Sequence, residues 1–172
     1  MSQQKTSFAN DLAVKNDHML FVSATDVGKV FEVDLTTRTI KEIANIKGAN
    51  GIYYNQSTDE LYVCGFDLKD AKGGEVGFIH WLRGEPIYKK IADLQGAFDG
   101  ITLLNDYTLL ISDWGALDRP AGFLKKVDLR SKAITRLKLP ILDGPADFYF
   151  DRSKNRLIIP ALKQNKILIE NL

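Results

Sequence analysis

The sequence is poor in the residues from which many functional sites are built. Its 172 residues include one cysteine, Cys64, and two histidines, His18 and His80. A single cysteine excludes an internal disulfide and a cysteine-based metal cluster, and two histidines leave little scope for a histidine-rich metal site. Cys64 lies in the apolar stretch YVCGF, where a small buried hydrophobic residue is the commoner role and a reactive thiol the rarer one.

An excess of charge of one sign and long apolar runs are also lacking. The 23 Lys and Arg against 22 Asp and Glu leave a formal net charge of +1, so we expect neither nucleic acid nor a membrane surface as a partner. No apolar run approaches the roughly 18 residues of a membrane-spanning helix. The first residues, MSQQKTS, lack the apolar core of a secretory signal. The sequence therefore does not decide the cellular compartment. The hydrophobic content of 45% predicts a chain that folds into a globular domain.

What the sequence does contain is a fourfold repeat. Each unit begins with small or apolar residues and an Asn or Asp, continues with an apolar run and a polar turn, and ends in a second apolar run that carries a leucine. The segments are 8–24, 48–65, 96–113 and 144–161. The Asn and Asp residues are Asn10, Asn50, Asp99 and Asp147, and the leucines that follow 10 or 11 residues later are Leu20, Leu61, Leu109 and Leu157.

The repeat predicts β-structure throughout the chain. Short apolar runs joined by turns rich in Asn, Asp and Ser indicate hairpins, and further alternating runs such as KVFEVDL (29–35) follow in each unit. A period of 40 to 50 residues with four strands is typical of a β-propeller. We therefore predict an all-β chain, one propeller domain over 1–172 with three and a half to four blades of four-stranded antiparallel sheet. The expected blades are 8–47, 48–95, 96–143 and 144–172.

Asn10, Asn50, Asp99 and Asp147 stand at the entrance to the innermost strand of each predicted blade. In a propeller these entrances meet at one mouth of the central channel, so the four side chains are expected to converge. A ring of amide and carboxylate oxygens suits a hard divalent cation, with calcium as the first candidate. Asn and Asp are also common in turns before strands, where their side chains accept hydrogen bonds from nearby backbone N–H groups. Spacing alone leaves these two roles evenly matched.

Three motifs resemble blade entries of the SMP-30/gluconolactonase/LRE-like proteins, six-bladed propellers with paraoxonases and strictosidine synthase-like proteins as more distant relatives. They are FANDLAV (8–14), ANGIYYNQSTDELYV (49–63) and FDGITLLNDYTLLISDW (98–114). The resemblance implies a catalytic divalent ion at Asn50 and Asp99, with Asn10 as a further ligand and Asp11 near a second, structural ion. Asp147 matches a ligand position only loosely. Relatives are often periplasmic or secreted, whereas this chain shows no leader.

The chain departs from the family in its number of blades. The family closes six blades and takes a metal-binding glutamate from the first, for which this sequence has no clear counterpart. The resemblance therefore implies the C-terminal portion of such a propeller, an incomplete six-bladed ring with exposed apolar flanks. Such flanks predict self-association or a partner chain that completes the ring. A four-bladed ring closed by residues 2–7 is the less favoured alternative.

A substrate pocket is expected where the second strand of a unit ends. Trp114 would supply an apolar wall, Asp113 a base or a water-holding group, and Phe66 occupies the matching place in the second unit. Packing of Trp114 between blades, with Asp113 as a turn former, is the more common arrangement of such residues.

Two functions fit these patterns. In a divalent-metal-dependent lactone or ester hydrolase, the ion polarises the carbonyl of a small-molecule substrate and Asp99 activates the attacking water. In a non-catalytic propeller, the same surface binds a ligand or a protein, or the chain serves as a piece of a larger assembly. The missing glutamate and the incomplete ring favour the second function, and the blade-entry motifs favour the first.

Overall fold

The computed structural model describes residues 7–67, 69–91 and 93–172, and these fold into antiparallel β-sheets. The first sheet contains β1 (Ala9–Val14), β2 (Met19–Ala24), β3 (Lys29–Asp34) and β4 (Thr39–Asn45). The second contains β5 (Ala49–Asn55), β6 (Glu60–Gly65), β7 (Val76–Leu82) and β8 (Glu85–Lys90). The third contains β9 (Phe98–Asn105), β10 (Thr108–Asp113), β11 (Phe123–Asp128) and β12 (Ile134–Arg136).

The fourth sheet is shorter by one strand. It consists of β13 (Tyr149–Asp151), β14 (Arg156–Ala161) and β15 (Lys166–Asn171), with a 3₁₀ turn at Leu162–Gln164 between the last two strands. Among the described residues there is no α-helix, and none of the described elements is a helix long and apolar enough to cross a bilayer. The all-β propeller predicted from the repeat is confirmed.

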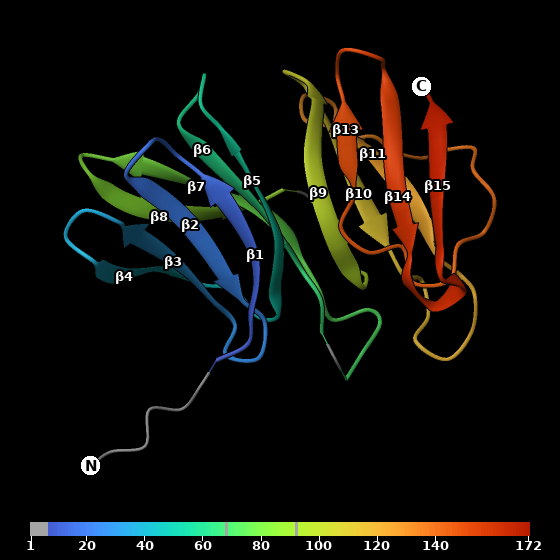
Figure 1. Cartoon of the computed structure of the whole chain (residues 1–172), viewed down its shortest axis with the longest axis horizontal. Helices are drawn as coiled ribbons and strands as arrows, with labels where there is room; N and C mark the ends of the chain where they lie inside the picture. The colour runs from blue at the N-terminus through green and yellow to red at the C-terminus, as the bar shows by residue number, and fades with distance from the viewer. Residues whose placement is uncertain (1–6, 68, 92) are drawn as a thin grey trace.

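The four sheets follow one another as propeller blades. Figure 1 shows the first blade in blue at one side and the last in red at the other. β1 packs on β5, and β5 packs on β9. The six-blade count that the family resemblance implies is wrong for this chain, because each repeat of 40 to 50 residues supplies one sheet and the described residues supply four.

Asn and Asp side chains close the hairpins. Asp34 Oδ1 accepts the backbone N–H groups of Thr36 and Thr37, and Asp128 Oδ1 accepts those of Arg130 and Ser131. Such turns satisfy the backbone where the strand ladder stops. In the turns that mark the repeat, Asn16 accepts the N–H groups of His18 and Met19, Asn105 accepts that of Tyr107, and Asp151 accepts that of Lys154. These polar turns therefore have a local structural cause, independent of any ligand.

The core consists of apolar layers between consecutive blades. Leu61, Leu109 and Leu157, the repeat leucines of the last three units, are fully buried in successive layers. Leu20, their counterpart in the first unit, is only half-buried. The difference follows from position, because no described blade precedes the first.

The Asn-Gly and Asp-Gly pairs mark close contacts between inner strands. A side chain at Gly51 would collide with the backbone of Asp99, and one at Gly100 would collide with Asp147. β-Bulges interrupt the ladder between Ala9 and Leu12 and between Ala49 and Ile52. A bulge re-aims the side chains on either side of it, here at the entrance to the inner strands.

Candidate functional site

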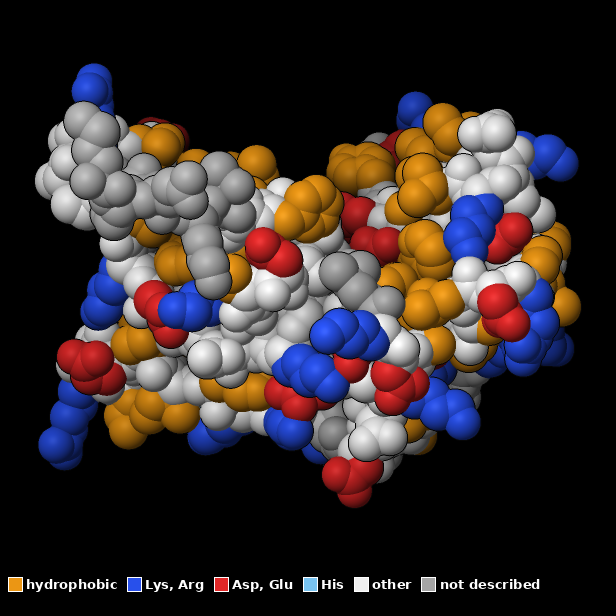
Figure 2. Space-filling model, turned by 90° about the horizontal axis from the view of Figure 1, so that it is seen from below, with side chains coloured by type: hydrophobic (Ala, Val, Ile, Leu, Met, Phe, Trp, Pro, Cys, Tyr) orange, Lys and Arg blue, Asp and Glu red, His pale blue; other side chains and the backbone are white. Residues whose placement is uncertain are grey.

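The inner strands line a cleft of about 470 Å³. Its walls include Asp11, Ile52, Ile101, Asp147 and Arg152. Figure 2, seen from below, shows the notch between the two halves of the molecule, with acidic side chains at its floor. A concave site of this size with a few polar groups suits a small molecule.

Asp11 connects the first two blades at the acidic end of the cleft. Its Oδ2 accepts the backbone N–H of Ile52 at 2.7 Å, and its Oδ1 accepts the N–H of Leu12 at 2.7 Å. Burial nevertheless raises the pKa of Asp11 above its ordinary value, and the two backbone hydrogen bonds only offset part of that rise.

Asp99 lies in the next gap between blades. Its Oδ2 accepts the indole N–H of Trp114 at 2.9 Å. Loss of solvent raises the pKa of Asp99 to about 6, the Trp114 hydrogen bond lowers it, and the charge of Asp11 raises it further. Asp99 therefore carries a proton more readily than an ordinary surface carboxylate.

Asp147 completes the acidic group. Its Oδ1 accepts the backbone N–H of Phe148 at 2.8 Å. Desolvation raises the pKa of Asp147 to about 7, and the charges of Asp11 and Asp99 add to the rise. Asp147 is an exposed residue and Asp99 a half-buried one, so solvent screens the shift of Asp147 more strongly and Asp99 is the better-supported of the two. The three carboxylates thus act on one another, which is the electrostatic signature of negative charge in excess.

Asn50 lies in the inner strand of the second blade and is buried. It is 4% exposed, and its Oδ1 has no hydrogen-bond partner among the described residues. A buried carbonyl oxygen without a partner costs free energy unless something donates to it or coordinates it. Asn50 precedes Gly51, which packs against the Asp99 backbone, so its amide belongs to the same junction between blades.

Asn10, the fourth residue of the predicted ring, points elsewhere. It is exposed, and its Nδ2 donates to Thr25 Oγ1 at 2.9 Å within its own blade. Its neighbour Asp11 occupies the acidic end of the cleft instead. The structure therefore brings Asp99 and Asp147 together with Asp11, while the part of Asn10 in any ion site stays a prediction.

The donor set fits a hard divalent cation in chemical type. In the described part of the chain, no three Asp, Glu, His or Cys side chains are gathered closely enough to form a coordination shell by themselves. Carboxylate and amide oxygens are nevertheless the ligands that calcium prefers. Asp11, Asp99, Asp147 and Asn50 are the residues that would hold it.

Asp113 has a different environment from these carboxylates. Lys125 Nζ lies 2.7 Å from its Oδ2, and its Oδ1 accepts the N–H groups of Gly115 and Ala97 at 2.8 and 3.3 Å. Both oxygens are thus engaged in holding the third blade together. The sequence assigns Asp113 a role as a base or a water-holding group, and this role stays a prediction. Both carboxylate oxygens of Asp113 are already occupied by other partners.

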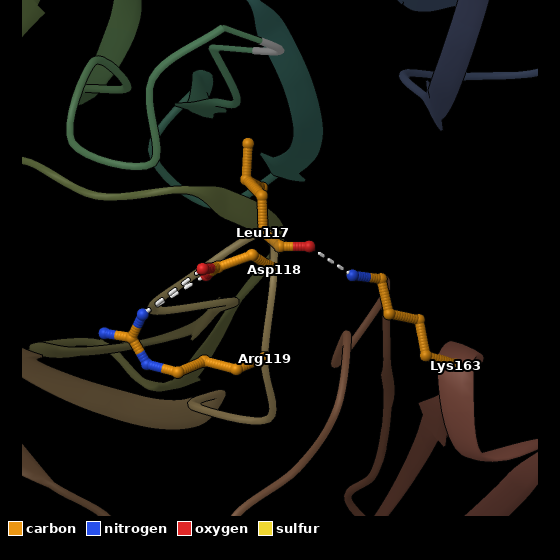
Figure 3. Close-up of polar contacts among 4 residues, drawn as sticks. All are labelled: Leu117, Asp118, Arg119 and Lys163. Atoms are coloured by element: carbon orange, nitrogen blue, oxygen red, sulfur yellow. Dashed lines mark hydrogen bonds and ion pairs between the residues drawn. The ribbon is translucent and has the colours of Figure 1, made fainter.

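Trp114 supports Asp99 from outside the cleft. Its ring meets Phe66 edge-on at 5.1 Å, and the Lys163 ammonium lies 5.3 Å from the ring centroid. Lys163 also donates to the Leu117 carbonyl at 2.5 Å, which ties the loop after β10 to the last blade (Figure 3). The described residues that line the cleft include Asp11 and Asp147, whereas Asn50, Asp99, Phe66, Asp113 and Trp114 lie outside its lining.

Sequence reasoning missed Arg152. Its guanidinium donates to the carbonyls of Leu103 and Leu104 at 2.5 and 2.9 Å and to the Tyr53 hydroxyl at 3.2 Å. It therefore joins three blades at the end of the cleft away from the acidic group. In the sequence Arg152 stands in the polar turn DRSKN and carries no signal beyond that of a solvated turn residue.

Comparison with known proteins supports the fold. No protein-family model and no curated protein sequence matches the chain. Among solved structures, an auxiliary nutrient-binding protein from Bacteroides thetaiotaomicron aligns over 96% of this chain and 39% of its own, with a TM-score of 0.76 and 14% identity. A gluconolactonase from Xanthomonas campestris aligns over 92% of this chain and 56% of its own, with a TM-score of 0.71 and 16% identity.

A streptogramin B lyase is also similar, over 99% of this chain and 56% of that chain, with a TM-score of 0.63 and 13% identity. This chain spans less than two thirds of the length of each of these proteins. At such identities the likeness shows the fold alone, which is that of a β-propeller.

Proposed function

We propose that this propeller domain binds a divalent cation, calcium in the first place, at the acidic end of its cleft, and that the site hydrolyses a lactone or ester. The supporting observation is the presence of carboxylates that repel one another together with the amide oxygen of Asn50, which has no partner among the described residues. A cation satisfies both features at once, because it neutralises the carboxylates and gives the amide oxygen a partner.

The chain's own groups would act together with the cation in this hydrolysis. A bound divalent cation supplies polarisation of the carbonyl and stabilisation of the oxyanion. In the proposed reaction Asp99 takes a proton from the attacking water and returns it to the alkoxide that leaves when the ring C–O bond breaks. Trp114 fixes the orientation of the Asp99 carboxylate, and Ile52 and Ile101 give the cleft an apolar wall.

The second candidate is a non-catalytic domain that holds a small molecule in the same cleft. The engagement of both Asp113 oxygens favours it, because the second predicted base is then tied up in structure. The fold neighbours include proteins named for each role, a gluconolactonase and a nutrient-binding protein.

Asp99→Asn tests the proposal, with Asp106→Asn as the matched control on an exposed hairpin turn. Calcium affinity, measured by titration calorimetry at pH 7.5, should fall at least tenfold in Asp99→Asn and stay unchanged in the control. Hydrolysis of a panel of lactones should disappear in the same variant and on chelation of the unmodified protein. Calcium binding without turnover would support the binding domain, and affinity that survives Asp99→Asn would refute the site.

A further inference from the structure

One face of the first blade's sheet is not covered by any blade among the described residues. Cross-strand register places six apolar side chains on that face, which we call the leading face: Leu12, Val14, Leu20, Val22, Phe31 and Val33. Leu12 and Val14 are 60% and 63% exposed. An apolar sheet face of this extent is unusual on a surface that contacts only water.

The repeat shows what normally covers such a face. Ile52 and Val63 of the second blade correspond to Leu12 and Val22, and both are buried against the first blade. Ile101 and Ile111 hold the same positions in the third blade and are buried against the second. Within this chain, the leading face of a blade is covered by the blade before it.

The last blade is open on its opposite face. Register places Tyr149, Ile158, Pro160, Ile167 and Ile169 together on what we call the trailing face. Tyr149 and Ile167 are 64% and 66% exposed. Here too a sheet presents an apolar surface that is not packed against another described blade.

The trailing face also has buried counterparts. Ile158 follows the repeat leucine of its blade, as Phe21, Tyr62 and Leu110 do in the first three. Those three side chains are at most 4% exposed and belong to the layers against the following blade. In this chain, therefore, a trailing face is the surface that packs on a leading face.

Charge does not oppose contact between the two open faces. The ionic groups on the leading face form the Lys29–Glu42 pair, with 2.5 Å between Nζ and Oε2. On the trailing face, Asp151 and Arg156 pair at 3.2 Å. Because each pair is satisfied within its own sheet, contact would not bury an unpaired charge.

We infer that the leading face of one copy packs on the trailing face of a second copy, head to tail. Such a contact repeats the junction that this chain makes three times internally, with the same repeat positions on each side. A head-to-tail contact uses two different surfaces, so it closes into a ring or extends as an open assembly according to the rotation between copies. This inference is independent of the proposed cation site.

Two variants separate this arrangement from other contacts. Val14→Glu disables the leading face and Ile167→Glu disables the trailing face, both at exposed positions where a charge is compatible with folding. Leu82→Glu, at an exposed apolar residue of the second blade, is the control. Masses are measured by analytical ultracentrifugation over a range of concentrations, and circular dichroism verifies the fold of each variant.

The unmodified chain and Leu82→Glu should associate as concentration rises, whereas Val14→Glu and Ile167→Glu alone should remain monomers. An equimolar mixture of these two variants should give a dimer, because it contains one intact face of each kind. A monomeric unmodified chain would overturn the inference and leave the faces to a different partner. Association that survives Ile167→Glu, or a mixture that stays monomeric, would also overturn it. If either variant misfolds, Leu12→Lys and Ile169→Lys provide the same test.

Discussion

Asp99 and Asp113 are carboxylates on paired strands of the third blade, yet their surroundings are opposite in kind. Asp113, 3% exposed, meets a lysine ammonium and two backbone N–H groups. Asp99 meets one indole N–H and the charges of other carboxylates. Burial alone therefore does not identify a functional acid. The hydrogen-bond partners distinguish the two carboxylates. A carboxylate whose oxygens are satisfied by protein donors stabilises the fold, whereas one with too few donors can accept a ligand.

Removal of the charge of Asp113 should have the largest effect on stability. In Asp113→Asn the Lys125 ammonium, with its side chain 16% exposed, loses its counterion in a largely apolar setting. We expect the free energy of unfolding to fall by about 3 kcal/mol. Urea denaturation measures it, and calcium affinity should stay unchanged. A loss near that of the surface control Asp106→Asn, about 0.5 kcal/mol or less, would mean that the pair contributes little.

Variation of pH should give an intermediate effect that belongs to Asp99 and Asp147. A carboxyl whose pKa is raised on folding from 3.8 to about 6 or about 7 binds its proton more tightly in the folded state. Its contribution to stability is therefore greatest below 3.8 and is lost as pH rises through 6 and 7.

Denaturation at several pH values, without divalent ions, should show this loss in the unmodified chain relative to Asp99→Asn/Asp147→Asn. Calcium should restore stability to the unmodified chain above pH 7 and should not do so in the double variant. Parallel curves for the two proteins between pH 4 and 7 would contradict the raised pKa values.

The indole hydrogen bond should give the smallest effect. Trp114→Phe retains an aromatic ring beside Phe66 and removes only the N–H that Asp99 accepts. Loss of about 1 kcal/mol of support for the charged carboxylate corresponds to roughly fivefold weaker calcium binding. Calorimetry at pH 6 and pH 8 measures it, and the loss should be greater at pH 6, because the pKa of Asp99 rises when the donor is removed. If Trp114→Phe bound calcium as tightly as the unmodified protein at both pH values, a role of Trp114 in orienting Asp99 would be excluded.

The fold was largely predictable because its signals are local. Alternating apolar residues need no knowledge of distant contacts, and neither do turns in which Asp34 or Asp128 accepts a backbone N–H from two residues further along. Four repeats in the sequence correspond to four blades, whereas the six-blade count came from relatives.

The site was predictable only in part, because it depends on backbone bulges and strand pairing that the residue types do not reveal. The bulge between Ala9 and Leu12 gives Asp11, rather than Asn10, its place at the acidic end of the cleft. Bulges carry no fixed residue signature, so the sequence could not decide between the two neighbours. The partner of Asp113 was equally hidden, because Lys125 reaches it only through the pairing of β10 with β11.

The guanidinium of Arg152 has a mechanical consequence. It fastens the last blade to the carbonyls of β9 and to a phenol of the second blade, so it limits how far the blades can splay. Arg152 therefore limits the width of the cleft between the inner strands, including the distance among the aspartates, although it lies at the other end of β13. One side chain in a hairpin loop thus helps to set the angle between consecutive blades.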